Sequence, residues 1–205
     1  WDEFISAVDL AENSLGPIIL SSSDIQFRGA QSITLKDLIA PYEDAKETAR
    51  LLDSGQRVLR DPGPDTFFKV GRSIELHFRY IWFGEAISNW DNRGFMISKV
   101  LYQLRQFLMG KNLSPSIEWT DLKTKEKITL KPAGGPWKIF QEHVSTSKKN
   151  KQDFWAMNSA HKEITDLRNG AAHKAPKSWE ELRPLWQKVC TEMDKFKASF
   201  DRIFG

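Results

Sequence analysis

The apolar residues between positions 182 and 203 recur at alternating steps of four and three, which is the spacing of one face of an α-helix. The series follows Ser178 and Glu181, whose types and spacing form a capping box, in which each side chain satisfies a backbone amide at the other residue. A stripe of this length predicts a helix that packs along its whole length against other helices. Its members are Leu182, Trp186, Val189, Met193, Phe196, Phe200 and Ile203.

Similar three- and four-residue steps predict further helices earlier in the chain. Ile117 and Trp119, then Ile128 and Leu130, alternate instead with polar residues on either side of a Lys-rich turn, which predicts a small antiparallel hairpin between helices. We therefore expect a mainly α-helical bundle with a small β-hairpin insertion. The helices are expected at about residues 66–88, 97–108, 137–144 and 154–167.

The two signs of charge are unevenly distributed along the 205 residues, although the net charge is only +3. Residues 1–65 hold 12 acidic and 6 basic side chains, a net of −6, so residues 66–205 carry a net of +9. The change of sign coincides with the breaker sequence Asp-Pro-Gly-Pro-Asp at 61–65. We expect an acidic N-terminal segment, or the end of a preceding domain, at 1–65 and a helical domain at 66–205. The basic part indicates a polyanionic partner.

The acidic third has weaker patterns of its own. Phe4, Val8 and Glu12 indicate a short helix, and residues 18–20 are compatible with a strand. Residues 35–52 predict an amphipathic helix, with Pro41 near its start.

The single cysteine, Cys190, has no internal partner for a disulfide, which favours a cytoplasmic setting. The longest apolar runs are far shorter than the roughly 20 residues that span a bilayer, so we expect no membrane partner. The sequence begins at Trp1 without an initiator Met, which suggests a piece of a longer polypeptide with further domains.

One segment does not reduce easily to packing: Arg168-Asn169-Gly170-Ala171-Ala172-His173. It places a permanent cation, an amide and an imidazole close together, directly after a predicted helix. On an ideal helix, residues five apart point about 140° away from each other, so Arg168 and His173 would not converge. A joint site needs either a kink at Gly170 or two chains that each supply a motif.

This segment resembles the motif of the HEPN superfamily, helical domains of which many are metal-independent endoribonucleases. Their motif is Arg-x(4–6)-His, often with Asn directly after the Arg, and Arg168, Asn169 and His173 match its tight form. The resemblance covers about residues 66–205. Glu75 is similar to an acidic position in the first helix of several HEPN families.

The resemblance implies RNA cleavage by attack of the ribose 2′-OH on the adjacent phosphorus, without metal or cofactor. His173 would transfer protons near neutral pH, Arg168 would stabilise the charge that develops on the phosphate, and Asn169 would orient the imidazole or bind a phosphate oxygen. Because the motifs of two domains usually meet in this family, a homodimer is implied. We expect the effector part of a defence or toxin-type protein.

Other residues are candidates for supporting roles. His161 lies close enough in sequence to share the cleft, and the cations Lys148, Lys149, Lys151 and Lys174 could follow an RNA backbone. His77 and His143 are expected to be structural, and the spacing of the four histidines predicts no metal site.

Three alternatives stay open. Arg168 and His173 could simply complement the dipole at the end of a helix. The domain could be a non-catalytic module for dimerisation or for nucleotide or RNA binding. The acidic residues 1–65 could also lie over the basic face and restrain it.

Overall fold

The computed structural model describes residues 19–21, 34–55, 62–84, 97–120, 127–132, 134–172 and 178–205. In these ranges the chain is mainly helical with a small sheet, which confirms the predicted fold class. The helices are α3 (Leu35–Asp53), α4 (Pro62–Phe83), α5 (Ile97–Leu108), α6 (Gly135–Thr146), α7 (Lys151–Ala172) and α8 (Trp179–Phe204). The strands are β1 (Ile19–Ser21), β2 (Ile117–Thr120) and β3 (Lys127–Lys131).

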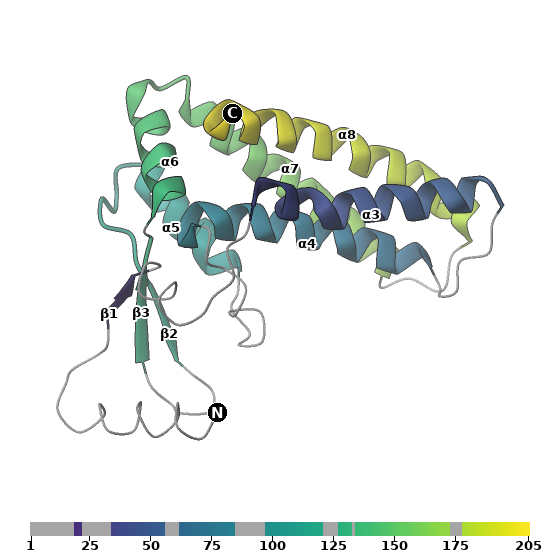
Figure 1. Cartoon of the computed structure of the whole chain (residues 1–205), viewed down its shortest axis with the longest axis horizontal. Coiled ribbons are helices and arrows are strands. Elements are labelled where there is room, and N and C mark those ends of the chain that lie inside the picture. Colours follow the sequence, from purple (N-terminus) through teal and green to yellow (C-terminus); the bar gives the residue numbers. More distant parts are fainter. Residues whose placement is uncertain are drawn as a thin grey trace.

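The four longest helices, α3, α4, α7 and α8, lie alongside one another, and α6 and the sheet lie at one end of them (Figure 1). Their apolar faces meet in one hydrophobic core, which contains Phe67 and Phe78 of α4, Phe154 of α7 and Phe196 of α8. Tryptophans also fill this core, and Trp82 among them is fully buried.

The last helix has the predicted start and the predicted buried face. The Ser178 side chain accepts a hydrogen bond from the Glu181 amide, and the Ser178 amide donates to the Glu181 carboxylate at 2.9 Å. All seven members of the 182–203 stripe are buried, and α8 packs mainly against α7. The capping box and the stripe are therefore both confirmed.

The helix expected at 66–88 begins four residues earlier and ends at Phe83. Its first turn includes Pro62 and Pro64, because the amides of a first helical turn have no partner within the helix and a proline there loses nothing. Gly84 follows with a φ of 67°, the left-handed conformation that commonly ends helices. Part of the predicted breaker thus lies inside α4.

The helix expected at 35–52 is confirmed as α3 and packs into the same core as the helices beyond residue 65. Tyr42 contacts the Trp186 ring at 6.4 Å between centroids, and the buried Ser73 hydroxyl of α4 donates to the Leu38 carbonyl at 2.7 Å. Asp44 of α3 pairs with Lys69 of α4 at 2.7 Å. The division of the chain into two domains stays a prediction, and the short helix expected near residues 4–12 lies outside the described residues.

The small sheet has the strand order β1-β3-β2. β2 and β3 are antiparallel with Ile117 opposite Leu130, which confirms the predicted hairpin. β1 adds to the other edge of β3 in parallel, at residues that overlap the strand suggested at 18–20.

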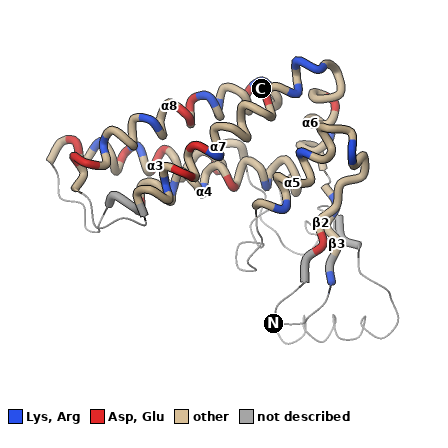
Figure 2. The backbone as a smooth tube through the Cα atoms, turned by 180° about the vertical axis from the view of Figure 1, so that it is seen from behind, with Lys and Arg blue, Asp and Glu red and all other residues tan. Residues whose placement is uncertain are grey.

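Both signs of charge occur along α3 and α8 (Figure 2), where ion pairs such as Glu47 with Arg50 lie within one helix. No helix in the described part of the chain combines the length and the apolar character that a bilayer crossing requires.

Candidate functional site

The predicted site residue Arg168 lies near the end of α7, on the same face as His161 and Thr165. Positions 161, 164, 165 and 168 differ by three, four and seven, so they form one stripe along two turns of the helix. α7 continues as a helix through Gly170 to Ala172. The break at Gly170 that would bring Arg168 and His173 together within one chain is therefore not seen in α7.

This stripe forms one wall of a pocket of about 290 Å³ between α4, α5 and α7. A water molecule occupies about 30 Å³ in the liquid, so the pocket has room for a group the size of a phosphate with part of its sugar. The lining residues are Gly71, Ile74 and Glu75 of α4, Ile97, Ser98, Leu101 and Arg105 of α5, and His161, Ile164, Thr165 and Arg168 of α7. The pocket thus contains three of the residues named from the sequence: Arg168, Glu75 and His161.

The Arg168 side chain leans across α4. A Cβ atom added to Gly71 would lie 3.1 Å from the Arg168 Nη1, so the absence of a side chain at this position makes room for the guanidinium. Its Cζ lies 5.9 Å from the centre of the Phe68 ring, in the range of a cation–π contact. Position 71 is therefore a second element of the site, and nothing in its local sequence pattern singles it out.

The hydrogen-bonding capacity of Arg168 is largely unused. Its Nε is buried, and no described residue accepts a hydrogen bond from it. Nη2 lies 3.5 Å from the Asn169 side-chain oxygen, at the outer limit of a hydrogen bond. In the described part of the chain, no carboxylate pairs with this guanidinium. Arg168 is thus a cation with free donors at the wall of a pocket.

A second guanidinium in the pocket, that of Arg105, was not predicted. Its Nε and Nη2 both donate to the Asn158 side-chain oxygen of α7, at 3.1 and 2.7 Å. These two hydrogen bonds fix the plane of the guanidinium, and Nη1 takes part in neither of them. The only sequence signal was a basic residue on the polar side of a predicted helix, which many solvent-exposed arginines share.

His161 is half-buried and is kept uncharged at neutral pH. Burial is the largest cause, and the positive charges of Arg105 and Arg168 add to it; together they lower the pKa of His161 from 6.5 to about 4. The ring packs edge-on against Phe78 at 5.7 Å between centroids, and its Nε2 lies 3.5 Å from the Thr165 hydroxyl. The imidazole is therefore a neutral hydrogen-bonding group beside two cations.

Glu75 is the one carboxylate that lines the pocket among the described residues. No ion pair joins it to either Arg105 or Arg168 within this part of the chain. With two arginines, one glutamate and a neutral imidazole, the lining carries one net positive charge. Such a pocket favours an anion that has its own hydrogen-bond acceptors.

The remaining predicted site residues are not gathered at this pocket. His173 and Lys174 lie outside the described residues. Lys148, Lys149 and Lys151 lie around the connection between α6 and α7, at the opposite end of α7 from Arg168 (Figure 2). The 17 residues between positions 151 and 168 correspond to about 25 Å along the helix axis. Lys151 Nζ there donates to the Leu108 carbonyl at 2.8 Å.

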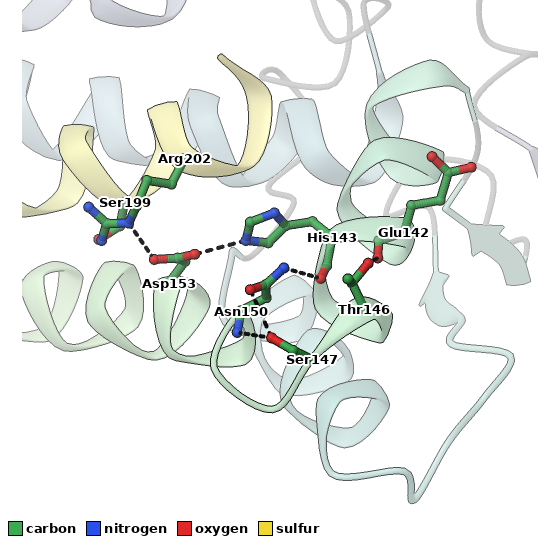
Figure 3. Close-up of polar contacts among 8 residues, drawn as sticks. All are labelled: Glu142, His143, Thr146, Ser147, Asn150, Asp153, Ser199 and Arg202. Carbon is green, nitrogen blue, oxygen red and sulfur yellow. Dashed lines mark hydrogen bonds and ion pairs between the residues drawn. The ribbon is translucent and has the colours of Figure 1, made fainter.

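The two histidines expected to be structural have internal partners. His77 is buried, its Nδ1 donates to the Ser73 carbonyl at 2.7 Å, and it packs edge-on against Phe200. Burial lowers the pKa of His77 to about 4. His143 of α6 lies in a different cluster, in which Asp153 binds both its Nε2 at 2.8 Å and the Arg202 Nε at 2.6 Å (Figure 3). The contacts of His143 connect α6, α7 and α8, and those of His77 lie within α4 and against α8. Both histidines are therefore explained as part of the framework.

In the ranges that the structure describes, no three His, Cys, Asp or Glu side chains are grouped so that they could hold a metal ion. Comparisons of the chain with models of known families, with curated proteins and with solved structures found no match. The assignment of a function therefore depends on the residues of the pocket and on the motif that contains Arg168.

Proposed function

We propose that the chain is a metal-independent endoribonuclease and that the pocket between α4, α5 and α7 binds the phosphate at which RNA is cleaved. The observation that carries the proposal is that Arg168, the first residue of the Arg-Asn-x3-His motif, lines the same pocket as a second guanidinium, Arg105. Its buried Nε lacks an acceptor among the described residues. A phosphate in the pocket would accept hydrogen bonds from these two guanidiniums.

The two guanidiniums would stabilise the negative charge that builds up on the phosphate during the reaction. Attack of the ribose 2′-oxygen on phosphorus forms the new P–O bond while the bond to the 5′-oxygen of the next nucleotide breaks. The products are a 2′,3′-cyclic phosphate and a free 5′-OH. Negative charge builds up on the phosphate oxygens during this exchange, and fixed N–H donors of Arg168 and Arg105 stabilise it in the pocket.

Proton transfer is assigned to His173, on the motif alone. An efficient general base has a pKa near the working pH, and the pKa of His161, about 4, is too low for that role. His161 instead offers a neutral nitrogen that orients the ribose hydroxyl. Asn169, next to Arg168, would orient the His173 imidazole or bind a phosphate oxygen. The general base accepts the proton of the 2′-OH, and the leaving 5′-oxygen receives a proton.

The proposal includes a homodimer. The helical course of α7 through Gly170 to Ala172 supports the geometry in which two chains each supply a motif. We also propose that the chain is the effector part of a longer defence or toxin-type protein, as its motif implies.

The test is cleavage of single-stranded RNA by the wild-type chain and by Arg168→Ala and His173→Ala variants, each with EDTA present. Both variants are expected to lose at least a hundredfold in rate, because each lacks a group that acts in the transition state. Arg168 makes no ion pair in the described part of the chain, so thermal unfolding should change little. Arg50→Ala is the matched control, since it removes an exposed guanidinium paired only within α3. Undiminished cleavage by both variants would refute the assignment.

The alternative, a module that binds RNA or nucleotides without cleaving them, is favoured by one observation. The histidine among the described lining residues, His161, has a pKa of about 4, which is too low for a general base at neutral pH. In that case Arg168→Ala weakens binding of RNA, and wild-type protein produces no ends with a cyclic phosphate.

A further inference from the structure

A second pocket, of about 440 Å³, lies on the other side of the first turns of α5. Ser98, Lys99, Tyr102 and Gln103 form one wall, and residues 116–118 at the start of β2 form the other. Ser98 lines both this pocket and the one that contains Arg168. The two pockets are therefore neighbours that share one residue of α5.

The most conspicuous group in the second pocket is the Tyr102 side chain, which is 56% exposed. No described residue forms a hydrogen bond with its hydroxyl. An aromatic ring with an open face is the surface on which single-stranded nucleic acids stack their bases, whatever the base. Exposed side chains are common on protein surfaces, so an exposed ring indicates a base-binding site only together with suitable neighbouring groups.

Two polar side chains that line the same pocket, Lys99 and Gln103, are held in place by hydrogen bonds. Lys99 Nζ donates to the Glu118 carbonyl at 3.0 Å, which fixes the ammonium group against another residue that lines the pocket. The Gln103 side-chain oxygen accepts from Asn112 at 3.0 Å, which anchors its amide. A fixed cation and a fixed amide beside an aromatic face suit a nucleobase and its sugar-phosphate backbone better than they suit an apolar ligand.

We propose that the second pocket binds an unpaired nucleobase of an RNA strand, stacked on Tyr102, while the adjacent phosphate of the same strand lies at Arg105 and Arg168. This inference rests on the proposed function for the choice of RNA but does not require cleavage. Tyr102 and Arg105 are three residues apart on α5, so they are neighbours on the helix surface, about 4.5 Å apart along its axis. Because a base within a duplex is already stacked and paired, the arrangement selects single-stranded RNA.

The experiment uses a short single-stranded oligonucleotide with 2′-O-methyl riboses, which cannot be cleaved by 2′-OH attack, and one 2-aminopurine, whose fluorescence falls when it stacks. Binding is measured for wild type, Tyr102→Ala and Tyr102→Phe. Tyr102→Ala is expected to raise Kd about five- to tenfold, at the low end of stacking contributions. Tyr102→Phe keeps the stacking face and should stay within about twofold. Ile139→Ala is the control, because Ile139 is a similarly exposed side chain of α6 that lines neither pocket.

The outcomes separate this inference from the proposed function. Equal Kd values for wild type and Tyr102→Ala overturn the base-binding pocket, even if the protein cleaves RNA. Binding that depends on Tyr102, without cleavage of unmodified RNA, supports the pocket and overturns the endoribonuclease. Equal affinity for the single strand and its duplex, or no binding of the single strand, also refutes the base-binding role of the second pocket. In either case, cleavage of unmodified RNA tests the endoribonuclease proposal separately.

Discussion

Replacing Gly71 with alanine tests whether the contact with α4 sets the position of the Arg168 guanidinium. The new Cβ would lie 3.1 Å from Arg168 Nη1 and 3.4 Å from its Cδ. The first distance is shorter than ordinary van der Waals contact, and the atoms belong to a flexible side chain rather than to backbone. The helix therefore stays in place, and the guanidinium moves by a few tenths of an ångström.

The expected change in stability is small, because two effects oppose each other. Alanine is favoured over glycine inside a helix by about 0.5–1 kcal/mol. Displacing Arg168 from its preferred rotamer costs about 0.5–1.5 kcal/mol. The free energy of unfolding should thus stay within about 1 kcal/mol of wild type. The rate of RNA cleavage should fall about three- to tenfold, since a displacement of 1 Å in a catalytic site costs about a hundredfold.

The matched variant is Gly170→Ala, which adds the same methyl group to α7. A Cβ at Gly170 meets none of the described residues within 4 Å, so we expect only the gain in helix propensity. Urea unfolding should show this variant to be equal to wild type or up to about 1 kcal/mol more stable, with an unchanged cleavage rate. Cleavage and RNA binding measured on both variants decide the matter. Wild-type values for Gly71→Ala would show that the position of Arg168 is not set by α4 or is not used.

Two further predictions concern acid stability. The folded chain keeps His77 neutral, with a pKa of about 4, whereas the unfolded chain protonates this residue near pH 6.5. The free energy of unfolding should therefore fall by up to about 3 kcal/mol as the pH drops from 6.5 to 4. Urea unfolding between pH 7 and pH 4 measures this change, and a similar pH dependence in His77→Gln would contradict the role of His77. Burial works against the ionised form of Asp153, but hydrogen bonds from Arg202 and His143 outweigh it and lower the pKa of this carboxyl. The contribution of Asp153 to the free energy of unfolding is therefore present above about pH 4 and is lost as the pH falls through the folded pKa. In the same assay, Asp153→Asn should lower the free energy of unfolding by about 1–3 kcal/mol at pH 7. An equally stable variant would show that the cluster does not hold α6, α7 and α8 together.

The parts of the fold that local patterns determine were predictable. The stripe that ends at Ile203, the capping box at Ser178 and the alternation around Ile117 each depend on residues a few positions apart, and each appears as expected. The start of α4 was placed too late, because Pro62 and Pro64 are breakers within a helix but acceptable in its first turn. The pairing of β1 with β3 joins residues more than 100 positions apart, and no local pattern encodes it.

The candidate site shows the same division between local and distant relations. Arg168 and Asn169 could be named because they are adjacent in a recognisable motif. Arg105 could not, because its place in the pocket comes from the packing of α5 against α4 and from its bonds to Asn158 on another helix. Gly71 could not either, since a glycine in a helix acquires meaning only when the side chain that crosses it is known.

A comparison of the two polar clusters favours the pocket over the histidine cluster as the functional site. Around Asp153 the carboxylate has a partner on each oxygen, so the cluster is satisfied within the fold (Figure 3). In the pocket, Arg168 leaves a buried N–H without an acceptor among the described residues, at a cost of about 1–3 kcal/mol. Arg105 adds a second cation beside it, and Glu75 pairs with neither within the described chain. Local conflicts of this kind lower stability and are expected where a ligand completes the arrangement. An anion in the pocket would accept hydrogen bonds from the guanidiniums of Arg105 and Arg168 and would reduce the repulsion between these two cations, which is the physical reason for placing the phosphate there.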